Sequence, residues 1–143
     1  MQCMQQTSRT IFRVELINMK TKAEDYFEKG IEFGIAGEHE KAIDCFSRVI
    51  ELSPVLTEAY YNRGTAYGES RQYQKAIEDF SKAIELNPNN VDAYTNRGTA
   101  YSDLGQYQKA IDNYNKAIEL DPYNQTAINN KNIWLEDHPE LKS

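Results

Sequence analysis

Three asparagines recur along the chain at intervals of 34 residues: Asn62, Asn96 and Asn130. The amide of asparagine carries two hydrogen-bond donors and one acceptor oxygen. A row of such amides can hold the backbone of an extended polypeptide, whatever the side chains of that polypeptide are. The other interpretation is that each asparagine braces a neighbouring segment of its own chain. In both cases the pattern predicts non-covalent hydrogen bonding rather than catalysis.

The residue types that catalysis or metal binding requires are few and scattered. Only two histidines occur, of which His39 is expected to pack in a turn and His138 lies near the C-terminus. The two cysteines have no metal-ligand or disulfide spacing, so free thiols are expected. Adjacent carboxylates such as Glu78 and Asp79 do not face each other on a helix. No nucleotide-binding, zinc-protease or nucleophile motif is present either. We therefore predict no enzyme, no metal and no cofactor.

The composition is that of a small soluble protein, with 143 residues, 16.5 kDa, 27% charged residues and 40% apolar residues. No apolar run approaches the roughly 18 to 20 residues that span a bilayer. The N-terminal residues lack the apolar core of a secretory signal. We therefore expect a cytoplasmic protein without a membrane partner.

The charge is distributed unevenly along the chain. Residues 1–22 hold four basic side chains and one acidic side chain, whereas residues 23–143 hold 12 basic and 21 acidic side chains. An acidic body has little with which to neutralise phosphates, so we predict no nucleic-acid partner. The same acidity favours basic or neutral partners.

The chain contains an internal repeat. Residues 57–90 and 91–124 align without a gap and are identical at 21 of 34 positions, and residues 23–56 form a weaker copy. A fixed period of this length indicates stacked units of the same structure. Within each copy the apolar residues are spaced by three and four, which is typical of amphipathic helices. A proline then follows the second helix of each copy and ends it.

Glycine recurs inside the first helix of each copy. A glycine in the middle of a helix costs about 0.5–1 kcal/mol relative to alanine, so three in the same register need a reason. We expect a bulky side chain of the second helix to lie against each glycine backbone. The expected pairs are Gly30 with Phe46, Gly64 with Phe80, and Gly98 with Tyr114.

This pattern resembles the tetratricopeptide repeat (TPR), a helix–turn–helix unit of 34 residues. The residues that carry the resemblance are Tyr26, Gly30, Phe33, Ala42, Phe46 and Pro54, then Tyr60, Gly64, Tyr67, Ala76, Phe80, Ala83 and Pro88, then Tyr94, Gly98, Tyr101, Ala110, Tyr114, Ala117 and Pro122. The resemblance implies an all-α fold: a right-handed α-solenoid of antiparallel helix pairs with about seven helices. The expected parts are repeats at 23–56, 57–90 and 91–124, a capping helix at 125–137 and a frayed tail at 138–143.

Three basic residues depart from the usual family pattern. Lys29, Arg63 and Arg97 stand where leucine is commonest in the family. We expect their aliphatic stems to cover the apolar seam while their charged heads reach water.

The resemblance also implies that the first helices of successive repeats line a concave groove in which partners bind. No lysine or arginine is expected to point into it. Asn62, Asn96 and Asn130 would form an asparagine ladder along this groove. Similar ladders hold peptides in some TPR proteins. The expected groove residues are Glu24, Phe27, Glu28, Ile31, Glu58, Tyr61, Asn62, Thr65, Glu69, Asp92, Thr95, Asn96, Thr99, Asp103 and Asn130.

The expected groove differs from that of TPR co-chaperones, which grip a chaperone's C-terminal carboxylate with lysines and an arginine. The corresponding positions here hold Phe27, Asp92 and Asn96, and Ile31 replaces a clamp asparagine, so that only Asn62 matches. We therefore do not expect the clamp function. We predict a protein–protein interaction module or adaptor that binds an extended segment with lysine or arginine and one or two apolar residues.

Residues 1–22 form a basic arm that also contains apolar residues, among them Phe12 and Leu16. The arm has the composition expected of the groove's ligand. We expect it to be flexible or docked, in its own groove or in that of a neighbour, which would give a homo-oligomer. The alternative function is therefore a self-assembling scaffold, by end-to-end stacking or arm swapping, without a foreign peptide. An exposed Trp134 at the end of the stack would support this alternative.

Overall fold

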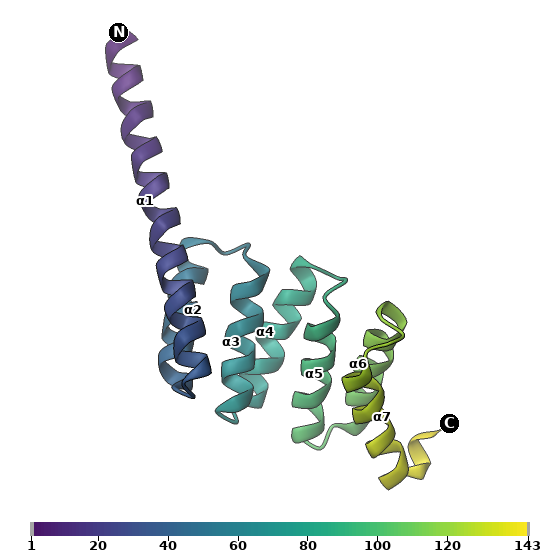
Figure 1. Ribbon diagram of the computed structural model, residues 1–143. Coiled ribbons are helices and arrows are strands. Elements are labelled where there is room, and N and C mark those ends of the chain that lie inside the picture. The colour runs from purple at the N-terminus through teal and green to yellow at the C-terminus, as the bar shows by residue number, and fades with distance from the viewer. Residues whose placement is uncertain (1, 143) are drawn as a thin grey trace.

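The computed structural model describes residues 2–142, with side chains for residues 6–140. Among these residues there are helices and no strand. The helices are α1 (Gln2–Ile35), α2 (His39–Leu52), α3 (Thr57–Glu69), α4 (Tyr73–Leu86), α5 (Val91–Asp103), α6 (Tyr107–Leu120), α7 (Gln125–Asp137) and the short 3-10 helix η1 (Pro139–Lys142). Figure 1 shows antiparallel helix pairs stacked side by side from the N-terminal to the C-terminal end. This is the α-solenoid that the sequence predicts.

Short turns close each helix pair and join it to the next. The turns within the three pairs place Gly37, Arg71 and Gly105 at φ values of 74°, 61° and 72°, in the left-handed region. Glycine adopts this conformation without strain, whereas arginine does not. The helices α5 and α7 each begin at an asparagine cap. The side-chain oxygens of Asn90 and Asn124 accept backbone N–H groups three residues later, at 3.0 and 2.8 Å.

The recurring glycines let the two helices of each pair approach closely. A Cβ atom placed on these glycines would lie 2.7 Å from the ring of Phe46 at Gly30, 3.0 Å from the ring of Phe80 at Gly64, and 2.7 Å from the ring of Tyr114 at Gly98. Distances this short leave no room for a methyl group. The predicted pairing of each glycine with an aromatic ring of the second helix is confirmed.

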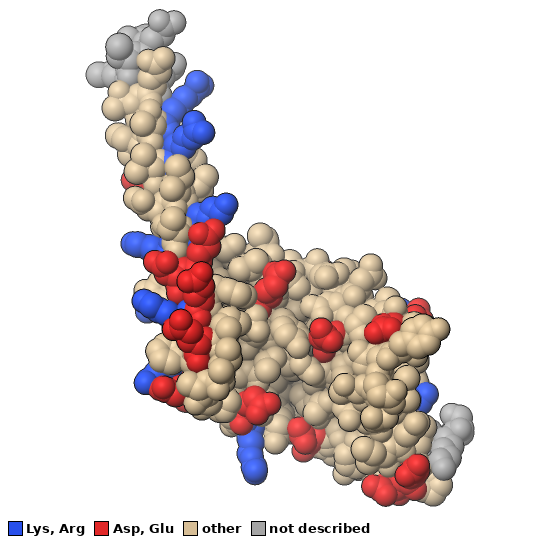
Figure 2. Space-filling model, in the orientation of Figure 1, with Lys and Arg blue, Asp and Glu red and all other residues tan. Residues whose placement is uncertain are grey.

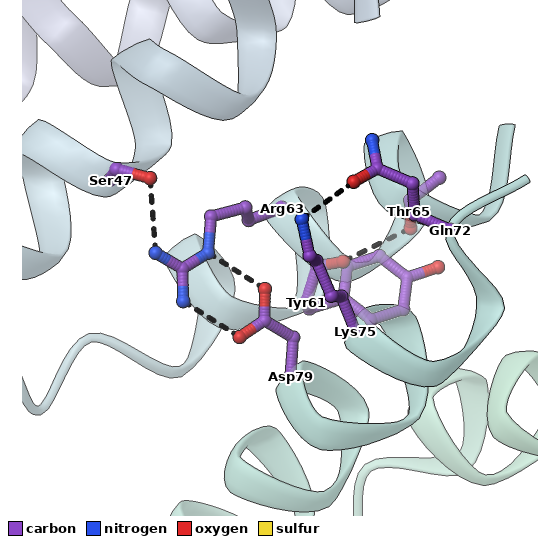
Figure 3. A network of polar contacts seen from close by, with 7 residues as sticks. All are labelled: Ser47, Tyr61, Arg63, Thr65, Gln72, Lys75 and Asp79. Carbon is purple, nitrogen blue, oxygen red and sulfur yellow. Dashed lines mark hydrogen bonds and ion pairs between the residues drawn. The ribbon is translucent and has the colours of Figure 1, made fainter. Parts of the chain in front are cut away.

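Arg63 connects three helices through a polar network (Figure 3). Its Nε and Nη2 donate to the two carboxylate oxygens of Asp79 on α4, at 2.7 and 2.8 Å, and its Nη1 donates to the Ser47 hydroxyl on α2 at 3.0 Å. The side chain of Arg63 is 20% exposed. The expectation that its head reaches water is therefore wrong, because the head is held between two second helices.

Arg97 makes the equivalent contacts one repeat later. Its Nε donates to Asn113 Oδ1 at 2.8 Å and its Nη1 donates to the Ser81 hydroxyl at 3.0 Å. Each arginine thus bonds to the second helix of its own pair and to that of the preceding pair. These contacts set the spacing between successive pairs, and with it the spacing of the first helices.

The N-terminal arm is the part of the fold that differs most from expectation. Instead of a flexible leader or a segment docked in the groove, residues 2–22 continue the helix of the first repeat, so that α1 projects well beyond the stacked pairs (Figure 1). The side chains of residues 6–22 are all exposed. The local reason is that no proline or glycine precedes Gly30, so nothing in the sequence ends the helix there.

The C-terminal end is covered by α7, which packs on α6. The ring of Trp134 stacks on Tyr107 with centroids 4.5 Å apart, and the ring of His138 lies 4.6 Å from that of Tyr107. Trp134 is therefore half-buried rather than exposed, and it does not support end-to-end stacking. The expected frayed tail begins instead with this aromatic contact and continues as η1.

Candidate functional site

The first helices of successive pairs, α1, α3, α5 and α7, form one face of the stack, here termed the first-helix groove. It contains a hollow of about 190 Å³ between α1 and α3 and another of about 400 Å³ between α3 and α5. The expected site residues that line the α1–α3 hollow are Ile31, Asn62, Thr65 and Glu69. Those that line the α3–α5 hollow are Thr65, Glu69, Asn96, Thr99 and Asp103.

The remaining expected residues lie outside these two hollows. A third hollow, of about 660 Å³, is found where the arm leaves the body, and it is here termed the arm-base hollow. The expected residues that line it are Glu24, Phe27, Glu28 and Glu58. Tyr61, Asp92 and Asn130 line none of these three hollows. The predicted site is thus divided among the two groove hollows, the arm-base hollow and positions on the first helices outside all three.

Thr95 was expected in the groove, and the structure contradicts this. Its side chain is 4% exposed, and its hydroxyl donates to the Val91 carbonyl at 3.0 Å within its own helix. Tyr61 of α3 reaches across to Asn96, the next residue of α5, with which it bonds. Thr95 therefore has almost no surface to offer a ligand.

The three asparagines make similar use of their amide nitrogens. Nδ2 of Asn62 donates to the Glu58 carbonyl at 2.8 Å, that of Asn96 to the Tyr61 hydroxyl at 3.0 Å, and that of Asn130 to the Thr99 hydroxyl at 3.4 Å. Asn96 and Asn130 therefore brace the preceding first helix. One N–H per amide is used in this way. Within the described residues the amide oxygens of Asn62 and Asn96 accept no hydrogen bond, so each of these two amides keeps an acceptor and one donor. The side chain of Asn130 also hydrogen-bonds with Tyr114, so its amide is less free.

Tyr61 on α3 lies beside the groove residue Asn96. Its ring packs on Phe80, with centroids 5.9 Å apart. Burial raises the pKa of the Tyr61 phenol, and the negative charge of Asp92 raises it further, while the hydrogen bond from Asn96 acts in the opposite direction. The phenol is therefore neutral at physiological pH and offers a ligand an uncharged surface.

The groove carries acidic side chains, and Figure 2 shows them spaced across the face of the stack with a denser group on α1. One cation was not expected. Arg71 lies in the turn between α3 and α4 and lines the α3–α5 hollow beside Glu69 and Asp103. The sequence held a signal for it, because Arg71 stands 34 residues from both Gly37 and Gly105, at a turn position that favours glycine.

Arg71→Gly is expected to raise the free energy of unfolding by about 0.5–1 kcal/mol, because it removes the strain of a left-handed arginine. The reciprocal change Gly105→Arg is expected to lower it by a similar amount. A Cβ at Gly105 has open space around it, with its nearest neighbour 3.9 Å away, so only the backbone conformation is tested. Urea unfolding measures the free energy of unfolding of both variants. A loss of stability in Arg71→Gly would contradict the explanation that the backbone of Arg71 is strained.

Two structural features are absent from residues 2–142. In this part of the chain no group of three or more histidine, cysteine, aspartate or glutamate side chains is arranged to hold a metal ion. No helix in the same part combines the length and the apolar character needed to cross a membrane.

The sequence matches known repeat families. The tetratricopeptide repeat profile matches residues 57–90 and 91–124, and a second TPR repeat profile matches residues 33–70. Among curated proteins, an uncharacterised protein of Methanocaldococcus jannaschii is 47% identical over 38 residues, which is 27% of this chain. The match spans 44% of that relative, less than half of its length.

Solved structures resemble the whole stack. The TPR domain of Arabidopsis OM64 is 32% identical with a TM-score of 0.79, over 85% of this chain and 98% of that domain. The first TPR of Spaghetti (RPAP3), bound to the HSP90 peptide SRMEEVD, is 29% identical with a TM-score of 0.79, over 82% of this chain and 93% of that one. The recurring glycine–aromatic pairs, the paired helices and these matches lead to one conclusion: the chain belongs to the tetratricopeptide repeat family.

Proposed function

We propose that this TPR protein is an interaction module that holds an extended, basic and apolar segment of another protein in the first-helix groove. The observation that carries the proposal is the pair of amides of Asn62 on α3 and Asn96 on α5, each with a free acceptor and a free donor, among acidic side chains. An extended backbone needs such alternating partners. Carboxylates at the rim attract lysine and arginine and set the choice of partner more than the affinity.

Each part of the groove has a separate role in this proposal. The amides of Asn62 and Asn96 bond to the ligand backbone. Glu69 and Asp103 pair with a cationic side chain of the ligand. Ile31, on the floor of the α1–α3 hollow, receives an apolar side chain.

The charge of the groove distinguishes this chain from the solved relative that binds the HSP90 peptide. That peptide, SRMEEVD, contains two glutamates and an aspartate. Glu69 and Asp103, which line the α3–α5 hollow, would repel such a ligand. We therefore propose a partner of the opposite charge.

Replacing the ladder in the variant Asn62→Ala/Asn96→Ala is expected to weaken partner binding at least about tenfold, because two hydrogen bonds of roughly 1 kcal/mol each are lost. The measurement is affinity capture from the source cell's lysate, with retained proteins identified by mass. Asn115→Ala/Asn132→Ala is the matched control, since both asparagines are exposed and line neither groove hollow. Circular dichroism checks that every variant is folded.

A protein that wild type and the control retain, and the ladder variant loses, supports the proposal. Its retention is also expected to fall as ionic strength rises, because exposed charges are screened by salt. Equal capture by all three baits would place the partner outside the groove, and the proposal would fail.

Self-assembly is the second candidate function, and one observation favours it. The apolar side chains of the arm are exposed in the single chain, including Phe12, Leu16 and Ile17. A surface of this kind is typical of an interface that another molecule covers.

A further inference from the structure

The projecting part of α1 needs a partner to be stable as a helix. Phe12 is 68% exposed and Leu16 is 59% exposed, and the neighbouring residues Ile11, Val14 and Ile17 are β-branched. An isolated helix of this length is marginal in water even with the best helix formers, and β-branched and aromatic residues lower its stability further. The apolar surface of the arm is therefore expected to be covered in solution.

The arm-base hollow provides an apolar surface next to the arm. It is lined on α1 by Leu16, Ala23 and Phe27, at the end of α2 by Leu52, and on the loop after α2 by Leu56. Its volume of about 660 Å³ is larger than that of either hollow in the first-helix groove. Large apolar side chains entering from outside would fill it.

The charges on α1 show what fits this surface. Arg9 and Arg13 lie in the projecting half of α1, whereas Glu24 and Glu28 lie where α1 joins the body. The spacing of these four charged residues places them along one side of the helix, together with Leu16. Figure 2 shows the same separation, with lysine and arginine on the projecting arm and a dense acidic group at its foot. One α1 helix is thus basic at one end and acidic at the other.

This arrangement is complementary to itself in the antiparallel direction. The pair Arg9 and Glu28 and the pair Arg13 and Glu24 have the same midpoint in the sequence, between Asn18 and Met19. Two copies of α1 that run in opposite directions about this centre would set both arginines of one copy opposite both glutamates of the other. A parallel pair would instead bring arginine against arginine, which is unfavourable.

We propose that the protein forms a two-fold symmetric dimer through antiparallel pairing of the α1 helices of two copies. The register places Phe12 of one copy over Ala23 and Phe27 of the other, at the arm-base hollow. Lys20 lies opposite Ile17, where its stem covers apolar surface and its head reaches water. Each contact occurs twice, as an isologous interface requires.

The dimer does not depend on the proposed groove ligand. The α1–α3 and α3–α5 hollows lie outside the pairing surface, so Asn62 and Asn96 stay accessible. Glu24, Phe27 and Glu28, which the sequence assigned to the groove, serve the dimer instead. The acidic residues that remain for a ligand are those of α3 and α5.

The test is the mass of the full chain in solution, measured by sedimentation equilibrium. Wild type is expected at about 33 kDa, twice the chain mass of 16.5 kDa. The reversals Arg9→Glu/Arg13→Glu and Glu24→Arg/Glu28→Arg are each expected to raise the dissociation constant by about 100-fold or more, since four attractive contacts become repulsive. An equal mixture of the two variants is expected to return to the dimer mass as a heterodimer.

The control variant Asp92→Arg/Asp103→Arg changes the groove and leaves α1 intact, so it is expected to remain a dimer. Loss of its dimer would overturn the inference in favour of an arm bound in the groove of a second copy. A monomeric wild type, or a mixture that stays monomeric while both variants are folded by circular dichroism, would also overturn it. A failure of the groove ligand to bind would change none of these masses.

Discussion

Asp79→Ala is expected to lower the free energy of unfolding by about 3 kcal/mol, because it leaves a half-buried guanidinium without its carboxylate. The Asp79 side chain is 8% exposed and accepts two hydrogen bonds from Arg63, at 2.7 and 2.8 Å. The hydrogen bonds and charge of Asp79 raise the pKa of Arg63, while burial lowers it. Arg63 nevertheless stays charged when the carboxylate is removed, because an arginine side chain is not deprotonated in proteins. Ser47 then remains as its hydrogen-bond partner in the network of Figure 3.

Asp79→Asn is the matched control, because the next repeat already uses asparagine at this position. Asn113 accepts from Arg97 Nε at 2.8 Å. An amide at position 79 should therefore keep one hydrogen bond, and a loss of about 1 kcal/mol is expected. Urea unfolding followed by circular dichroism measures both variants. Equal losses, or no loss in Asp79→Ala, would show that the network does not hold the repeats together.

Gly98→Ala is expected to lower the free energy of unfolding by about 2 kcal/mol, because the added methyl group overpacks the core. Its Cβ would lie 2.7 Å from Cε1 and 2.9 Å from Cδ1 of Tyr114, and 3.2 Å from the Ala110 carbonyl oxygen. The Tyr114 ring is fully buried and cannot move aside without displacing its neighbours. The intrinsic preference of helices for alanine offsets part of this loss.

Gly68→Ala is the control, for which the free energy of unfolding is expected to change in the opposite direction. A Cβ at Gly68 on α3 has nothing within 4 Å, and the equivalent position of the next repeat is Ser102. A gain of about 0.5 kcal/mol is therefore expected, as the helix-favouring residue meets no obstacle. Thermal or urea unfolding distinguishes the two changes by sign. If both substitutions stabilised the protein, the close-approach explanation of the recurring glycines would be wrong.

The fold could be predicted from the sequence because its signals are local and repeated. The prolines after the second helices and the spacing of apolar residues define the pairs. The glycines and aromatic residues, such as Gly98 and Tyr114, then give the side on which the helices meet. Each signal occurs in three copies, so the repeats support one another.

The polar contacts were harder to predict, because they depend on distance in space. The sequence allowed the head of Arg63 to reach water, although Asp79 stands 16 residues later, just as Asn113 follows Arg97. Arg71 was missed because its importance lies in a backbone angle. The contact between Tyr61 and Asn96 spans two helices, and no pattern within one repeat contains it.

The central claim is that the first-helix groove selects basic and apolar extended segments. The most direct test is selection of a displayed random 12-residue peptide library on the immobilised protein. Wild type, Asn62→Ala/Asn96→Ala and Glu69→Lys/Asp103→Lys are compared, with SRMEEVD as a synthetic peptide beside them. Enrichment of peptides with lysine or arginine and apolar residues, lost in both variants, is the predicted result, together with no measurable binding of SRMEEVD. Enrichment of acidic peptides, or peptides that all three proteins retain equally, would contradict the account.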